Sequence, residues 1–228
     1  MTDVSVAEKG HNAGVQAVAA VLAVGGAFGG LWALGNVQGN TTSAKGPAAC
    51  SHDDDRQVSR RVSAHRLCTA LNRPDLPVLL GAPQEEARTA YGSESSFSGA
   101  DGSKVAMPSA EVDTKTYSVQ LTASDDRYPV SETASLMGTG AEKRTLLGHP
   151  AVLYSDHTIA IRFRLDGGRT ESGTGGIARH LMVALDPEDG GGSFELALWR
   201  QDDGTPDDAA LLRVAEQVLP TVPGWKAG

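Results

Sequence analysis

The sequence predicts an α+β fold, an antiparallel sheet covered by an N-terminal and a C-terminal helix and preceded by one transmembrane helix. Residues 13–37 carry no charged side chain, which is typical of a membrane span. Apolar residues recur at helical spacing after residue 57 and again before Pro220, and alternating segments typical of strands lie between these two patterns. Hairpin-paired strands flanked by helices favour α+β over a parallel, doubly wound fold.

The first expected element is an uncleaved membrane anchor over residues 13–37. As a helix it is about 37 Å long, which exceeds a hydrocarbon core of roughly 30 Å. Its glycines weaken the case, because each costs up to about 1 kcal/mol relative to alanine in a helix. A cleaved signal peptide and a buried soluble helix are the alternatives. The segment before the span balances Lys9 against Asp3 and Glu8, so it lacks the positive charge of a signal peptide.

Two overlapping G-x-x-x-G pairs lie inside this span, Gly25 with Gly29 and Gly26 with Gly30. Small residues at this spacing let a second membrane helix approach closely, so the pairs are candidates for helix-helix packing. The alternative is that an Ala/Gly-rich segment produces such spacings by chance.

The orientation of the anchor rests on two opposing signals. The positive-inside rule compares Lys9 with a more basic flank on the other side, made of Lys45, Arg56, Arg60 and Arg61. Cys50 and Cys68, an even pair beyond the span, instead suit an oxidising compartment. Because long domains translocate largely regardless of charge, we expect a single-pass protein of the cell membrane with its C-terminal domain outside.

This assignment divides the chain into a short N-terminal tail over residues 1–12, the transmembrane helix over 13–37, a linker over 38–49 and an extracytoplasmic α+β domain over 50–228. The linker is rich in Gly, Thr, Ser and Ala, a composition that cannot bury a core. The formal net charge of −8 and the scarcity of adjacent basic residues exclude nucleic acid as a partner.

The helix after the linker conflicts with a bridge between Cys50 and Cys68. Ser51 and Asp54 fit a capping box, and a buried stripe follows at Val58, Val62, His65, Cys68 and Leu71. A helix from His52 places the two cysteines about 25 Å apart, whereas a disulfide needs Cα atoms roughly 4.4–6.8 Å apart. A start nearer Gln57 lets the preceding residues fold back, and we favour the bridged alternative.

The remaining elements follow from changes in hydrophobic period. A short apolar stretch at residues 76–81 suits a turn or short helix, and Thr205 with Pro206 marks the start of a closing helix that runs to Leu219. We expect strands at 88–97 and 111–124, a short helix at 130–137, a hairpin of 151–154 with 158–165 across a turn at 155–157, and a hairpin of 177–185 with 194–199.

No pattern in the chain predicts catalytic, metal-binding or cofactor-binding residues. It contains neither a G-x-S-x-G nor an S-x-x-K motif. Its histidines lack an H-E-x-x-H motif, and His65 lies on the apolar stripe as a packed residue. The acidic, glycine-rich residues 186–192 lack calcium-loop spacing and suit a hairpin turn.

Residues 67–83, the strand motif at 193–199 and the closing helix together resemble a family of uncharacterised actinobacterial single-span envelope proteins. The resemblance implies a domain of unknown function and transfers no activity. More distantly, the order of elements is similar to Mog1/PsbP-like and mycobacterial lipoprotein domains, which serve binding or accessory roles. That analogy is to the fold, and a fold does not fix a function.

The expected function is therefore a non-catalytic, membrane-tethered binding or accessory domain with an unknown ligand, an envelope protein as possible partner and no cofactor. One alternative is an envelope hydrolase with an unfamiliar site that uses His149, His157 or His180. Another is an accessory subunit of a membrane complex joined through Gly25–Gly30.

Overall fold

The computed structural model describes residues 48–52, 57–98, 102–137, 140–162 and 171–227. The predicted span at 13–37, with its glycine pairs, lies outside these residues, and no helix within them is long and apolar enough to cross a membrane. The helices are α2 (Ala64–Leu71), α3 (Leu76–Leu79), α4 (Val130–Thr133) and α5 (Asp208–Val218), and a 3₁₀ turn follows at Leu219–Thr221. The strands are β1 (Ser51–His52), β2 (Thr89–Ser93), β3 (Ser96–Ser98), β4 (Lys104–Ala106), β5 (Ser109–Asp113), β6 (Tyr117–Ser124), β7 (Glu142–Leu146), β8 (His149–Arg162), β9 (Glu171–Ala184) and β10 (Ser193–Arg200).

Within the described residues the main sheet has eight strands in the order β1-β2-β5-β6-β10-β9-β8-β7. Only β1 pairs in parallel, with β2, and the other neighbours are antiparallel. The predicted α+β class with an antiparallel sheet is therefore confirmed. The two halves of the chain meet where β6 pairs with β10, so residues 117–124 lie beside residues 193–200 at the centre of the sheet.

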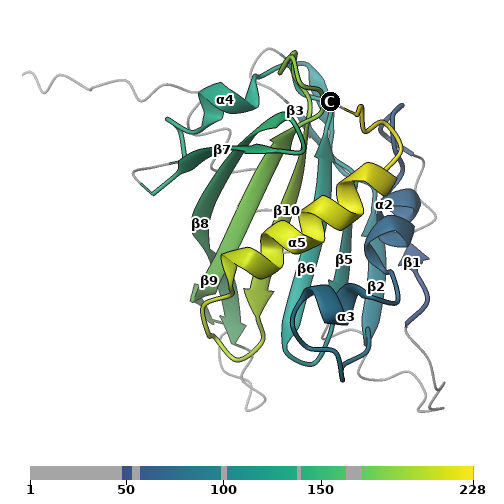
Figure 1. The fold of residues 1–228 in the computed structure, drawn as a ribbon, viewed down its shortest axis with the longest axis vertical. Helices are drawn as coiled ribbons and strands as arrows, with labels where there is room; N and C mark the ends of the chain where they lie inside the picture. Colours follow the sequence, from purple (N-terminus) through teal and green to yellow (C-terminus); the bar gives the residue numbers. More distant parts are fainter. Residues whose placement is uncertain (1–47, 53–56, 99–101, 138–139, 163–170, 228) are drawn as a thin grey trace, which may run out of the picture.

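Helices α2, α3 and α5 cover one face of this sheet, which we call the helical face. The α4 segment packs on the opposite face, where Val130 and Ala134 form a second core cluster with Val152, Tyr154 and Ala184. Figure 1 shows α5 running diagonally across the strands, with α2 and α3 beside it. Leu67 of α2 and Leu211 of α5 are fully buried against the sheet in one core cluster. Each such side chain stabilises the fold by about 1.5–3 kcal/mol through removal of apolar surface from water. The strand residues of this core include Val112, Val119, Leu121, Leu181, Phe194, Leu196 and Leu198.

The first helix begins later than predicted, and this delay makes the disulfide possible. Ser63 caps α2 by accepting a hydrogen bond from the Arg66 amide, so the residues before it are free to run along the sheet edge as β1. Cys50 and Cys68 are bridged with a Cα–Cα distance of 6.0 Å, as expected. The predicted stripe is wrong at His65, which is exposed, because Ala64, Leu67, Cys68 and Leu71 form the buried face of α2.

Two strand boundaries also differ from prediction. The expected single strand at 111–124 is two strands, because Thr114 closes a turn by donating its amide proton to the Tyr117 carbonyl. The expected turn at 155–157 is wrong: β8 continues through it, paired with β9 from Ala151↔Val183 to Arg162↔Glu171. Backbone pairing along β9 outweighs the turn preference of Ser155 and Asp156.

Other boundaries shift by a few residues. The predicted strand at 88–97 is divided into β2 and β3, and the predicted helix at 130–137 is confirmed as the shorter α4. The closing helix is confirmed, but its N-cap is Asp207 and not Thr205, since the Asp207 carboxylate accepts the Ala209 amide proton at 3.0 Å.

Candidate functional site

The second face of the sheet, opposite the helical face, carries the polar residues of the central strands. Side chains alternate between faces along a strand, so the residues between Phe194, Leu196 and Leu198 point away from the helices. Cross-strand register places one row of these residues side by side over six strands. The row reads Tyr91, Glu111, Gln120, Ala197, His180 and Tyr154.

A glutamate, a histidine and a tyrosine form a connected group on this face. The Tyr154 hydroxyl donates to Glu195 Oε1 at 2.6 Å, and His180 Nδ1 lies 2.8 Å from the same oxygen. The Tyr154 and His180 rings are stacked with centroids 4.8 Å apart. Because both contacts end on Oε1, Glu195 Oε2 has no hydrogen-bond partner among the described residues.

The environment moves the pKa values of this group in opposite directions. Burial opposes ionisation of Glu195, but hydrogen bonds and charge from His180, helped by Tyr154, outweigh it and lower the pKa of the carboxyl. Burial and the neighbouring Glu195 charge raise the pKa of Tyr154 well above its usual value. Glu195 is therefore a carboxylate and Tyr154 a neutral donor at neutral pH.

The contact with the Glu195 carboxylate determines which ring nitrogen of His180 can accept a hydrogen bond from another group. When Nδ1 donates to Glu195, Nε2 of the neutral ring is a lone-pair acceptor. Among the described side chains, only His149 Nε2 is both fully buried and without a hydrogen-bond partner. His180 Nε2 has no hydrogen-bond partner among the described residues, and the His180 side chain is 14% exposed. The group thus presents an oriented imidazole on a rigid sheet.

Two further carboxyl groups on this face, Glu111 and Asp113, lie on β5. Asp113 accepts hydrogen bonds from Thr89 and Ser118, and its charge acts on Glu111 two residues earlier on the same strand. Burial, reinforced by the Asp113 charge, raises the pKa of Glu111 to about 8. Perturbed carboxyl groups of this kind are typical of functional sites.

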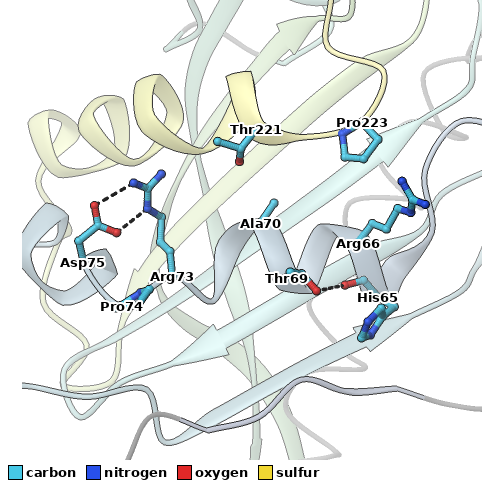
Figure 2. Close-up of a pocket in the computed structure, with 9 residues that line it drawn as sticks. All are labelled: His65, Arg66, Thr69, Ala70, Arg73, Pro74, Asp75, Thr221 and Pro223. Carbon is cyan, nitrogen blue, oxygen red and sulfur yellow. Dashed lines mark hydrogen bonds and ion pairs between the residues drawn. The ribbon is translucent and has the colours of Figure 1, made fainter.

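A groove of about 850 Å³ lies elsewhere, between α2 and the C-terminal segment after α5. Figure 2 shows Thr221 and Pro223 above the groove, with Arg66 near one end and the Arg73–Asp75 ion pair near the other. Most of its polar groups are already engaged. Arg73 binds Asp75 through two hydrogen bonds and also donates to the Gln217 carbonyl, and the Thr69 and Thr221 hydroxyls donate to helix carbonyls. The groove is therefore poor in unused polar chemistry compared with the second face.

The family assignment rests on the N-terminal part of the chain, up to residue 140. Residues 8–140 match a family of unknown function, DUF6215. The chain belongs to DUF6215. Comparison with curated proteins and with solved structures finds no match. The expectation of an uncharacterised family is thereby confirmed, while the actinobacterial source and the Mog1/PsbP-like analogy stay predictions.

The DUF6215 match divides the second face. Glu111 and Gln120 lie within the matched residues, whereas Tyr154, His180 and Glu195 lie beyond them. The match also includes the apolar segment at 13–37. The carboxyl pair of β5 is therefore part of the DUF6215 region, and the Glu195 group comes from the following hairpins.

Two other histidines of this DUF6215 chain, His149 and His157, contact groups outside the Glu195 group. His149 is fully buried with Nδ1 2.8 Å from the Ala184 carbonyl, and its ring stacks on Trp225. His157 is exposed near Gly175. No group of three or more potential ligands in the described part of the chain is placed to hold a metal ion.

Sequence reasoning missed the Glu195 group because its partners are distant in the chain. Tyr154 is 41 residues and His180 is 15 residues from Glu195. The available signal was Glu195 itself, the acidic residue inside the apolar strand S-F-E-L-A-L-W. A carboxylate at a strand centre needs a partner, and this points to a polar cluster on one sheet face.

Proposed function

We propose that this chain is a membrane-tethered, extracytoplasmic binding domain that holds a polar ligand on the second face of its sheet. The observation that carries the proposal is the Glu195–His180–Tyr154 group, whose carboxylate orients an imidazole in a side chain that is 14% exposed. Preorganised polar groups on a rigid sheet recognise ligands without an ordering cost.

The contacts of His180 favour binding over hydrolysis. A histidine that acts as a general base needs a nucleophile within hydrogen-bond reach. The described partners of His180 are Glu195 and the Tyr154 ring, and both act as orienting groups. The neighbour opposite His180 on β10 is Ala197, which supplies no nucleophile.

The tether is supported by the apolar residues 13–37 and by their inclusion in the DUF6215 match. The Cys50–Cys68 bridge supports an oxidising location for the domain. The Gly25–Gly29 and Gly26–Gly30 pairs are the proposed surface for an envelope protein partner within the membrane.

Ligand binding is tested on the full-length chain in a neutral detergent, titrated with a panel of amines, amino acids and sugars. Tryptophan fluorescence reports binding, because Trp199 and His180 lie on adjacent strands of the same face. We expect a saturable change that weakens in His180→Gln and persists in His157→Gln, the exposed control. Steady hydrolytic turnover that requires His180 would overturn the proposal.

A further inference from the structure

We propose that the Cys50–Cys68 bridge is a redox switch: it holds the entry segment of the domain, residues 48–52, on the edge of the sheet, and its reduction by a dithiol releases that segment. Figure 1 shows β1 at this edge, beside α2. The switch operates whether or not the second face binds a ligand, so it goes beyond the proposed function.

Few interactions other than the bridge hold the entry segment on the sheet. β1 has two residues and pairs in parallel with β2, whereas strands usually have three or more residues and parallel pairing is slightly weaker than antiparallel. The Ala48 amide donates to the Ala87 carbonyl at 3.1 Å, and the Asn72 side chain donates to the Ala48 carbonyl at 2.6 Å. The Ser51 hydroxyl donates to the Ala90 carbonyl at 3.1 Å. The covalent bridge is therefore the strongest link between this segment and α2.

The helix at the other end of the bridge is anchored independently. Leu67 and Cys68 of α2 are fully buried in the main core. The chain just before α2 is also fixed, because Glu94 accepts hydrogen bonds from the Val58 amide at 3.1 Å and from the Ala64 amide at 2.8 Å. Reduction therefore frees the entry segment and leaves α2 on the sheet.

The two cysteines differ in burial, and this difference sets the order of reduction. Cys68 is fully buried, whereas Cys50 is only partly buried. One thiolate of the dithiol attacks Cys50 Sγ to form a mixed disulfide, and Cys68 leaves as a thiolate. The second thiolate of the dithiol then attacks the mixed disulfide and releases Cys50. Two electrons pass to the bridge, the dithiol becomes a disulfide, and its two protons end on the cysteine thiols.

Release of the entry segment opens the edge of the sheet. β2 pairs with β5 on one side and with β1 on the other, so β1 covers its outer edge at Tyr91 and Gly92. When β1 leaves, the outward backbone groups of β2 at these positions lose their strand partner and face water. The oxidised protein therefore has a covered β2 edge, and the reduced protein has an open one.

The test is hydrogen–deuterium exchange of the full-length chain in neutral detergent, with and without dithiothreitol. The chain contains two cysteines, so the reductant acts on this bridge alone, and a free-thiol assay verifies complete reduction. We expect amide exchange in the entry segment to become at least about tenfold faster on reduction, with faster exchange at the outer edge of β2. Over the first minutes of exchange, the amides of β10 at the centre of the sheet should stay protected in both states.

Unchanged exchange in the entry segment after complete reduction would overturn the switch, because hydrogen bonds alone would then hold the segment. Rapid exchange of β10 would also overturn it, since the bridge would then support the whole sheet. The double variant Cys50→Ala with Cys68→Ala is the control for the reductant. It should show the exchange pattern of the reduced parent, and a further change with dithiothreitol would contradict the role of the bridge. Should the double variant fail to fold, the comparison of the oxidised and reduced parent still decides the outcome.

Discussion

At the scale of single residues, Glu111 and Glu195 show how different neighbours shift the pKa of the same side chain in opposite directions. Both are glutamates on the same face of one sheet, separated by β6. Burial acts on both, but His180 and Tyr154 stabilise the ionised form of Glu195, while Glu111 has only the like charge of Asp113 nearby. Their pKa values therefore move in opposite directions, and their contributions to stability have opposite pH dependence.

Glu195→Gln should destabilise the domain at pH 7 by about 1–3 kcal/mol, since His180 loses a charged acceptor. The folded-state pKa of Glu195 is lowered, so its contribution is present above its unfolded pKa and is lost as pH falls through the folded pKa. The difference in the free energy of unfolding between the variant and the parent should become smaller at acidic pH. Urea unfolding at pH 7 and at lower pH measures it, and a pH-independent difference would contradict this assignment.

Glu111→Gln should change the pH dependence of folding stability in the opposite direction to Glu195→Gln. Because the folded pKa is raised to about 8, the parent is most stable below the unfolded pKa and loses stability as pH rises towards and through 8. The variant avoids that loss, so we expect it to be more stable than the parent by about 2–4 kcal/mol at pH 9 and nearly equal at pH 4. Thermal unfolding at the two pH values tests this, with Glu216→Gln as the exposed control.

At the scale of elements, the sequence predicts which segments are helical or extended better than where they end. The closing helix follows from its apolar stripe, and its observed core residues include Leu211, Val214 and Val218. Its cap was misassigned because Thr205 and Asp207 both suit the position, and only the backbone direction after Pro206 selects Asp207. The long β8 was missed for a related reason, since its partner β9 is a tertiary feature.

The cap assignment predicts a clear contrast between two alanine variants. Asp207→Ala removes the acceptor for the Ala209 amide and should cost about 1 kcal/mol of folding stability. Thr205→Ala should have little effect, because Thr205 is exposed and outside α5. Chemical denaturation of both variants checks the assignment, and an equal loss in both would contradict it.

The disulfide joins Cys50, directly before β1 at the sheet edge, to Cys68 of α2. The bridge closes a loop with a sequence separation of 18, so its removal should cost about 3 kcal/mol in the chain-entropy model. The double variant Cys50→Ala with Cys68→Ala should therefore unfold at a lower temperature than the oxidised chain. Reductant should lower the stability of the parent and leave the double variant unchanged.

At the scale of the whole molecule, the bridge and the apolar segment bear on location together. Asn72 donates to the Ala48 carbonyl, and the bridge holds Cys50 against α2, so the chain enters the domain at a fixed point beside the sheet edge. The sequence predicts the tether from composition, whereas the second face emerges only when distant strands pair.

The proposed anchor and orientation give the last prediction. The full-length chain should sediment with membranes and resist carbonate extraction, because residues 13–37 are long enough to span the hydrocarbon core. Protease added to spheroplasts should digest the domain, while a cytoplasmic marker protein survives.

A Gly29→Leu variant should keep the membrane location but lose any partner that packs on the glycine pairs. Recovery of the chain in the cytosolic fraction with both thiols free would contradict the anchor and the oxidising location at once, because the span requires membrane insertion and the bridge an oxidising compartment.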